Sequence, residues 1–404
     1  MKTIKLTSAC NIVTGKLDSN AAVENGKYPY FTCAPEPLRI DTYAFDEDAI
    51  LLAGNNASGN FHCQRYDGKF NAYQRTYVIT AKRGYNIDFI YYSLLINLQL
   101  FRKIAQGSQT KFLTMEILNG FELDDLTYEK QVKLATVMKE IDSKIANNNA
   151  ICSNLEGISK LLYDYWFVQF DFPDENGKPY KSSGGKMVWN DELKREIPAG
   201  WDAGTFDDCI TSINTGLNPR DNFKLNTGGT IRYLTVKNLT TDGTIDFSSC
   251  DMIDEDARRI VHRRSDISVG DVLFASIAPL GRCCIITNEP KDWDINESVF
   301  SIRPNYENVT SIFLYMTFMS EFFIKKAEGS SVGSVFKGIR ISELQDLQTV
   351  IPPKDILDKY DTQVSRLFQM KANVIEETQQ LASLRDFLLP MLMNGQVKIK
   401  NDEA

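Results

Sequence analysis

Short apolar runs separated by Gly, Asn and Asp clusters fill residues 1–120 and again residues 201–345. Runs of this length and spacing predict β-strands joined by turns. In each stretch a longer apolar segment, from Asp88 to Ala105 and from Ser311 to Ala327, predicts one helix. The pattern therefore predicts two β-rich parts that each carry a helix.

Two further stretches have a different period. Between residues 128 and 166, apolar positions recur at alternating spacings of four and three, which is typical of coiled-coil packing. This seam comprises Leu134, Met138, Ile141, Ile145, Asn148, Cys152, Leu155, Ser159, Leu162 and Trp166. A matching C-terminal seam comprises Val364, Leu367, Val374, Thr378, Leu381 and Leu388. We expect the two helices, the first about 58 Å long at 1.5 Å per residue, to pack antiparallel as a spacer. Two surface helices on separate domains are the alternative.

The chain repeats itself. The segment around Gly107 resembles that around Gly329, and Ile50 to Ala53 resembles Val272 to Ala275, both at an offset of 222 residues. The helical patterns align at an offset of 226, and the starts of the two copies, near Gly15, at 201. The second copy therefore holds about 21 more residues before its Val272 strand. Duplication favours one task performed at two places, although an old duplication without a shared role gives the same pattern.

These patterns predict an α+β protein with an internal repeat related by a pseudo-two-fold axis. Residues 167–200 are polar and rich in Gly and Pro, which is typical of a linker. The predicted parts are a first β-rich domain at 1–120, a helix at 121–170, a linker at 171–200, a second β-rich domain at 201–350, and a helix with its tail at 351–404.

Composition and charge narrow the possible classes of protein. No apolar run approaches the roughly 18 residues of a membrane span, and the eight cysteines lack a Cys-x-x-Cys pair, so we expect reduced thiols, no metal and a cytoplasmic protein. The net charge is −8, but residues 1–120 hold 13 basic and 10 acidic side chains, and residues 201–345 hold 15 and 20. A dense basic cluster between Arg258 and Arg264 favours anion binding at a selected patch. A solvated face is an equally good reading.

Catalytic motifs are weak. The sequence shows no Gly-rich cofactor loop and no nucleotide-binding Gly-x-x-x-x-Gly-Lys-[Ser/Thr]. Asp174, Glu192 and Lys194 match the short carboxylate–Lys pattern of many Mg²⁺-dependent nucleases. That pattern arises often by chance, and here it falls in linker-like sequence. A binding subunit is favoured; a stand-alone nuclease and a protein-binding scaffold are the alternatives.

Several segments in this order resemble the specificity subunit of type I restriction–modification systems. They are Ala105 to Ser108, Ala327 to Ser330, Leu161 to Phe172, Glu196 to Trp201 and Leu384 to Gly395. The resemblance implies two target-recognition domains that each read half of a split double-stranded DNA site. It also implies spacer helices that dock two methyltransferase subunits, and a restriction subunit that translocates DNA. S-adenosylmethionine, ATP and Mg²⁺ would belong to those partners and none to this chain. The chain begins almost directly at its first recognition domain, which we expect to leave function intact.

Polar loop residues beside the repeated strands are the predicted DNA contacts, because Arg, Asn and Gln pair with base edges and Lys meets phosphate. In the first domain they are Asn55, Asn56, Gln64, Arg65, Gln109 and Lys111. In the second they are Lys237, Asn238, Arg258, Arg259, Arg263, Arg264, Arg282 and Lys337. The aromatic run Tyr163, Tyr165, Trp166 and Phe167 needs burial, for which a methyltransferase subunit is the expected cover.

Overall fold

The computed structural model describes residues 2–107, 109–278, 280–330, 338–393 and 396–397. The chain forms two compact units. The first comprises residues 1–149 and 375–404, and the second comprises residues 150–374. Two long helices, α5 (Tyr128–Tyr163) and α11 (Lys354–Met393), each contribute to both units.

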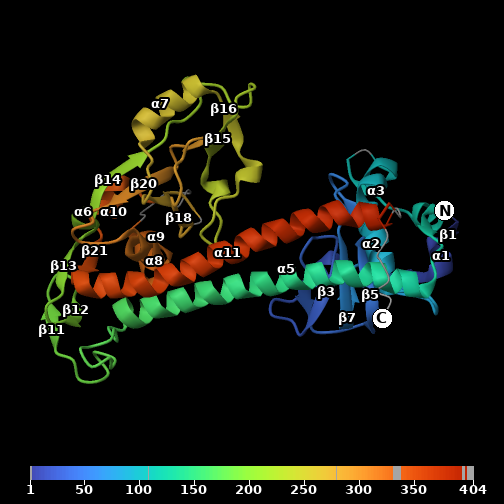
Figure 1. Ribbon diagram of the computed structural model, residues 1–404, viewed down its shortest axis with the longest axis horizontal. Coiled ribbons are helices and arrows are strands. Elements are labelled where there is room, and N and C mark those ends of the chain that lie inside the picture. The colour runs from blue at the N-terminus through green and yellow to red at the C-terminus, as the bar shows by residue number, and fades with distance from the viewer. Residues whose placement is uncertain (1, 108, 279, 331–337, 394–395, 398–404) are drawn as a thin grey trace. The chain divides into compact units, whose positions relative to one another are not determined.

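The β-rich part of the first unit is built on a six-stranded sheet (Figure 1). In spatial order its strands are β2 (Cys10–Thr14), β8 (Thr76–Ala81), β5 (Phe45–Ala53), β7 (Cys63–Ala72), β3 (Tyr28–Phe31) and β4 (Leu38–Ile40). Two short antiparallel pairs are β1 (Thr3–Lys5) with β10 (Glu122–Asp124) and β6 (Asn55–Asn56) with β9 (Lys111–Phe112). Short helical segments are η1 (Ser19–Ala21), α1 (Leu6–Ala9) and α4 (Met115–Gly120).

Both faces of this sheet are buried. Leu51 and Leu52 are consecutive on β5 and enter different clusters, because side chains alternate across a strand. Leu52 packs with residues of α2 (Ile87–Ile96) and α3 (Leu98–Ile104), and Leu51 packs with Phe31 and Phe70. The near-continuous apolar run at residues 49–53 is therefore a doubly covered strand.

The segments predicted as single helices are broken in both copies. In the first unit, Asn97 separates α2 from α3, and its side-chain amide donates to the carbonyl oxygen of Ser93 at 2.8 Å. In the second unit, Ser320 separates α8 (Ser311–Met319) from α9 (Glu321–Ser330). Its hydroxyl accepts from the amide of Phe323 at 3.2 Å, as an N-cap does. Apolar content alone predicted one helix each time, because it does not report such local polar bonds.

The β-rich part of the second unit contains two sheets. One has the order β14 (Ile210–Thr215), β20 (Val299–Pro304), β17 (Val272–Ala275), β18 (Cys283–Ile285), and the other β16 (Asp251–Ile253), β15 (Ile231–Leu234), β19 (Trp293–Ile295). A third pair joins β13 (Asp202–Thr205) to β21 (Gln348–Ile351). The helices are α6 (Phe206–Cys209), η3 (Val236–Asn238), η4 (Phe247–Ser249), α7 (Glu255–Ser265), α8, α9 and α10 (Ile341–Gln345).

Strand register confirms the repeat. Thr14 of β2 lies opposite Tyr77 of β8, and Thr215 of β14 lies opposite Phe300 of β20. Strand β5 then pairs with β8 as β17 pairs with β20. The surplus residues of the second copy fall between β14 and β17, the stretch that holds α7. The second copy thus keeps the common frame and carries an additional helix on it.

Burial along α5 and α11 follows the two predicted seams. All sixteen predicted seam residues, each within the described part of the chain, are buried or half-buried. In the first unit, Arg385 of α11 pairs with Asp142 of α5 at 3.3 Å, and Asn148 donates to Glu377 at 2.8 Å. In the second unit, Lys371 pairs with Glu156, and Trp166 contacts Tyr360. Within each unit residue numbers rise along α5 as they fall along α11, so the two helices run antiparallel there.

The segment predicted as a linker is folded. It contains a hairpin of β11 (Met187–Asn190) and β12 (Arg195–Pro198). Phe170, Phe172 and Trp201 are buried in the same core as α8, with Trp201 stacked on Phe172 at 5.1 Å between ring centroids. Helix α5 ends in a π-helical turn, η2 (Asp164–Val168). The aromatic run there is also covered internally, because only Tyr165 of its four residues is exposed.

Candidate DNA-binding surfaces

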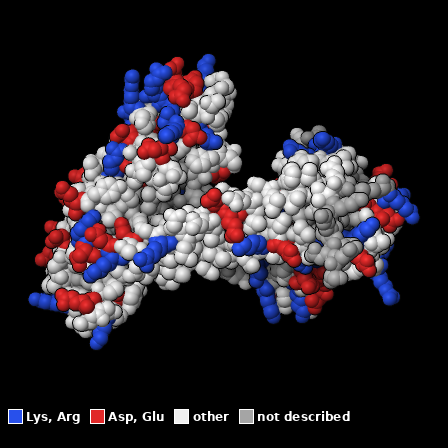
Figure 2. All heavy atoms as spheres, in the orientation of Figure 1, with Lys and Arg blue, Asp and Glu red and all other residues white. Residues whose placement is uncertain are grey.

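The basic cluster forms the outer face of helix α7. Asp254 caps the helix by accepting from the amide of Ala257 at 2.8 Å, and acidic residues fill the first turn and basic residues the last, as the helix dipole favours. Ala257, Val261 and Ser265 are buried at spacings of four. Arg259, Arg263 and Arg264 lie between these positions and are exposed. Figure 2 shows Lys and Arg gathered with acidic side chains over α7.

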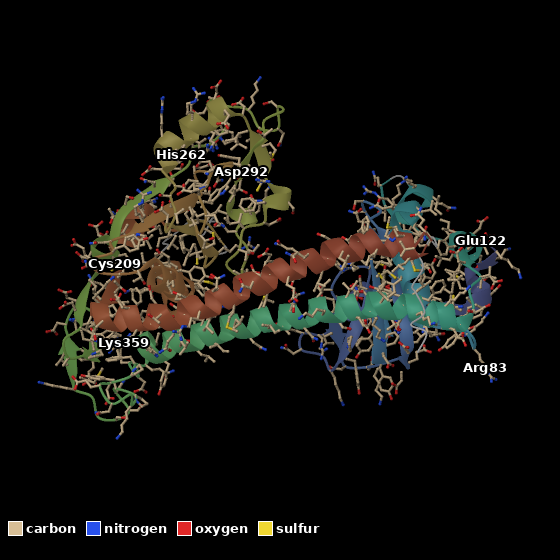
Figure 3. The ribbon with its side chains drawn as sticks, in the orientation of Figure 1. Arg83, Glu122, Cys209, His262, Asp292 and Lys359 are labelled. Carbon is tan, nitrogen blue, oxygen red and sulfur yellow. The ribbon has the colours of Figure 1, made fainter. Side chains whose placement is uncertain are left out.

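A buried carboxylate holds α7 in place. Asp294 of β19 is fully buried and accepts from the Ser265 hydroxyl at 2.6 Å and from the amide of Ile295 at 2.8 Å. His262 Nδ1 lies 3.1 Å from the other oxygen of Asp294 (Figure 3 labels His262). Burial raises the pKa of Asp294, and these hydrogen bonds act in the opposite direction. The helix is thereby tied to the sheet at its last two turns.

Beside α7 lies a hollow of about 540 Å³. Its lining comprises Asn214, Glu255, Arg258, Arg259, His262, Arg263, Arg264 and Asp266. Arg259, Arg263 and Arg264 are exposed, while the half-buried Arg258 donates to the carbonyl oxygen of Pro290. Five of the eight lining residues are basic or histidine, so the hollow suits an anion such as a DNA phosphate.

The structure places the other predicted contacts of the second unit differently. Asn238 is fully buried, and its side chain bonds to Thr235, Asp246 and Ser249, so its position leaves no room for a DNA contact. Lys237 is half-exposed and pairs with Asp251 at 3.7 Å. Two predicted contacts of this unit remain. Arg282 donates to the Val236 carbonyl oxygen, and Lys337 lies outside the described residues. An Asn in a loop was a good candidate by type, but it serves here as a local cap.

Four predicted contacts of the first unit lie together. Asn55 and Asn56 of β6 pair with β9, where Lys111 lies opposite Asn56, and the exposed Gln109 precedes that strand. The Asn56 side-chain oxygen already accepts from the amide of Ser58 at 2.9 Å. Gln109 and Lys111 therefore remain the better placed of the four for an external contact.

The other two predicted contacts of this unit are engaged within the protein. Arg65 of β7 pairs with Asp48 and, at 2.9 Å, with Asp88. Gln64 donates to the carbonyl oxygen of Pro35 at 2.7 Å. Reaching DNA would require Arg65 to leave two carboxylates, which is costly for a half-buried ion pair. Sequence alone does not show these partners, which lie 17 and 23 residues away.

The nuclease-like residues lie in turns. Asp174 accepts the backbone amides of Asn176 and Lys178, both at 2.8 Å, and Glu192 and Lys194 lie in the β11–β12 turn, where Lys194 has a φ of 51°. Within the described ranges, no three His, Cys, Asp or Glu side chains form a group able to hold a metal ion.

The described helices include none with the length and apolar character needed to cross a bilayer. All eight cysteines are described and are free thiols.

Sequence reasoning missed two features of these surfaces. The charge pattern alone does not distinguish His262 from the arginines around it, although its spacing of three from the buried Ser265 indicates the anchored side of the helix. No charge pattern marks Arg75 of the first unit, because it lies between two strands without a neighbouring basic residue.

The fold and these surfaces define a class: a duplicated binding protein of mixed helices and mainly antiparallel strands, with polar and basic surfaces on each copy. Comparison with known proteins identifies the family. The model of the type I restriction modification DNA specificity domain matches residues 1–157 and 198–384, so the chain belongs to that family. Its function is accordingly DNA sequence recognition as the non-catalytic specificity subunit of a type I restriction–modification system.

Individual relatives agree. The chain is 26% identical over 390 residues to the type I restriction enzyme EcoDI specificity subunit of Escherichia coli, covering 93% of this chain and 83% of that protein. It is 26% identical over 324 residues to the MjaIX specificity subunit of Methanocaldococcus jannaschii, covering 80% and 72%. The crystal structure of an S subunit from M. genitalium shares the fold, with a TM-score of 0.59 and 16% identity over 97% of this chain and 95% of that one. The nuclease and scaffold alternatives receive no support.

Proposed function

We propose that each β-rich part reads one half of a bipartite double-stranded DNA site. The duplication is the observation that carries this proposal: two copies share strand register while differing in the side chains and helices they present. In the second copy the α7 arginines line a hollow suited to phosphate, and in the first Lys111 lies on β9, with the exposed Gln109 just before that strand. Two β-rich parts with the same backbone framework but different surface side chains suit the recognition of two different DNA sequences.

We assign to α5 and α11 the role of a spacer. Two ion pairs and a hydrogen bond link α5 to α11, at Asp142, Glu156 and the seam residue Asn148 of α5. Polar groups inside a seam specify register, because a shift would leave them buried without partners. A helix pair of defined register suits a ruler that keeps two half-sites about one DNA turn apart, roughly 34 Å.

Two exposed apolar pairs support two docking sites for methyltransferase subunits. Ile158 and Leu161 of α5 are exposed, and Leu161 is 68% accessible. Leu384 and Phe387 of α11 are exposed as well, with Phe387 61% accessible, and they stand at the repeat offset of 226 residues. Apolar side chains repeated on helices in this way suit burial by a partner.

In the proposed complex, S-adenosylmethionine, ATP and Mg²⁺ are bound by the methyltransferase and restriction subunits, and this chain supplies the choice of sequence. The free cysteines support a reducing compartment, the cytoplasm. The complex then methylates adenine at the site that the two β-rich parts select.

Exchange of one β-rich part tests the proposal. Replacing residues 1–120 with the matching segment of a relative, and co-expressing the product with the methyltransferase subunit, should change one half of the methylated motif. Methylome sequencing of a host lacking other methyltransferases reads the result. Replacing residues 201–350 instead is the matched control and should change only the other half. An exchange that alters both halves would show that the copies do not read independently.

Native mass spectrometry tests the stoichiometry. The wild-type complex should contain two methyltransferase subunits per chain, and Leu161→Asp or Phe387→Asp should each remove one. Val269→Asp, at an exposed apolar position outside the long helices that is 44% accessible, should leave the count unchanged. A one-to-one complex as the largest active species would refute the two-site arrangement.

A further inference from the structure

A second hollow, of about 480 Å³, lies in the first unit and includes none of the predicted DNA contacts. It opens where β2, β5 and β8 meet the loops around β9. Its lining comprises Thr14, Gly54, Gln74, Arg75, Tyr77, Gln106, Phe112, Leu113 and Thr114. Three long polar side chains therefore share one depression with two aromatic rings.

Backbone hydrogen bonds hold this hollow in shape. The amide of Gly54 donates to the carbonyl oxygen of Arg75 at 2.8 Å, and the amide of Leu113 donates to that of Gly54 at 2.9 Å. The Tyr77 hydroxyl donates to the Leu113 carbonyl oxygen at 2.8 Å. In the first copy a Cβ atom on Gly54 would lie 2.4 Å from the Arg75 oxygen, so glycine permits this close approach here, whereas the second copy has Ser276 at the equivalent position. The frame thus positions Arg75 before any ligand arrives.

The second unit contains the same frame. There the amide of Ser276 donates to the carbonyl oxygen of Ser298 at 3.0 Å, and the amide of Ile339 donates to that of Ser276 at 2.8 Å. These bonds are the repeat equivalents of the two at Gly54. Ser298 therefore stands where the first copy has Arg75. The backbone is shared, and the side chain that it presents differs between the copies, as expected at a specificity position.

Arg75 is available for an external ligand. Its side chain is exposed, and its guanidinium lies over the ring of Phe112, 5.2 Å from the ring centroid. Within the described ranges it forms no ion pair, whereas Arg65 of the same unit forms two. Stacking on an aromatic face orients the planar guanidinium and leaves its edge free to donate two parallel hydrogen bonds.

We infer that Arg75 reads a guanine of the first half-site, with its guanidinium donating to O6 and N7 in the major groove. This inference rests on the proposed DNA-reading role of the first β-rich part. Such a contact requires a guanidinium group of fixed orientation in a preformed recess. Arg75 meets this requirement because its guanidinium stacks on the ring of Phe112 in the hollow. Gln106 lines the same recess.

The test compares Arg75→Ala, Arg75→Lys and Arg83→Ala in the chain co-expressed with its methyltransferase subunit. Arg83 is an exposed arginine of the same unit, near the start of α2 (Figure 3). The Arg83→Ala change therefore removes the same charge as Arg75→Ala. Methylome sequencing gives the motif. Competition binding, with duplexes changed at one base pair at a time, gives discrimination even for a variant that no longer methylates.

Both Arg75 variants should relax one specified G·C position, lowering discrimination there by roughly 5- to 150-fold. The other half-site, the gap and the Arg83→Ala motif should stay unchanged. An unaltered motif with Arg75→Ala overturns the inference while the half-site proposal stands. Retained discrimination with Arg75→Lys, and a shallower salt dependence with Arg75→Ala, would identify a phosphate contact and also overturn it. A wild-type complex without a defined bipartite motif would instead refute the DNA-reading role itself.

Discussion

We expect Lys371→Met to destabilise the second unit. Lys371 lies in the seam of α11 with its side chain 12% exposed. Its ammonium group pairs with Glu156 of α5 and donates to the carbonyl oxygen of Asp242, which lies in a loop of the β-rich part. Methionine keeps most of the apolar stem but supplies no charge and no donor. The Glu156 carboxylate and the Asp242 carbonyl would then both lose a partner.

Exposure sets the size of the effect. Removing one partner of a fully buried ion pair costs about 3–5 kcal/mol, and an exposed pair contributes about 0.2–1 kcal/mol. Glu156 keeps 25% of its side-chain exposure, so water recovers part of its solvation. We therefore expect a loss of about 1–3 kcal/mol in the free energy of unfolding. For a unit of this size that loss lowers Tm by about 2–12 °C.

Thermal melting of the full chain measures the loss, and hydrogen exchange of residues 240–246 reports whether the loop is loosened. Lys359→Met is the matched control, because Lys359 is 56% exposed on the same helix and, among the residues that the structure describes, forms its one ion pair with the nearby Asp355. It should melt as the wild type does. Adding Glu156→Leu to Lys371→Met should recover stability by removing the unpaired carboxylate. Equal melting of the Lys371 and Lys359 variants would refute the reasoning, and a deeper loss in the double variant would attribute the cost to packing.

Three other outcomes follow from the structure. Inserting four residues, about one helical turn, after Asn148 should lengthen the gap in the methylated motif; methylome sequencing that shows altered specified bases would contradict the ruler. Changing the four α7 arginines to alanine should weaken DNA binding and reduce its salt dependence, by about 0.9 in the log–log slope per lost phosphate contact; unchanged titrations would leave α7 as a solvated face. Burial raises the pKa of Asp361 to about 6, so its ionisation opposes folding above that pH. Asp361→Asn should therefore raise Tm at pH 8, with a gain that shrinks between pH 6 and about 4, and a pH-independent gain would argue against this cause.

Local periodicity was enough to predict the repeated strands, the two long helices and their buried seams. Each of these depends on residues a few positions apart: side chains two apart share a face of a strand, and those three or four apart share a face of a helix. Leu134 and Val364 could therefore be assigned to the seams without knowing the partner. The same reasoning located the basic cluster of α7, because it is contiguous in the chain.

Tertiary structure decided which polar side chains are free. Nothing in the sequence distinguishes Arg65 from Arg75 as candidate DNA contacts. In the structure Arg65 forms ion pairs with Asp48 and Asp88, while Arg75 stacks on Phe112. It also placed Phe172, from a segment that is polar by composition, in a core formed with distant helices. An apolar pattern does not mark Lys371 as a residue half-buried between α11 and α5. It can lie there because Glu156 of α5 and the carbonyl oxygen of Asp242, in a loop 129 residues away, compensate its charge. The availability of a charged or polar group depends on partners brought in by folding, and no local pattern of the chain encodes those partners.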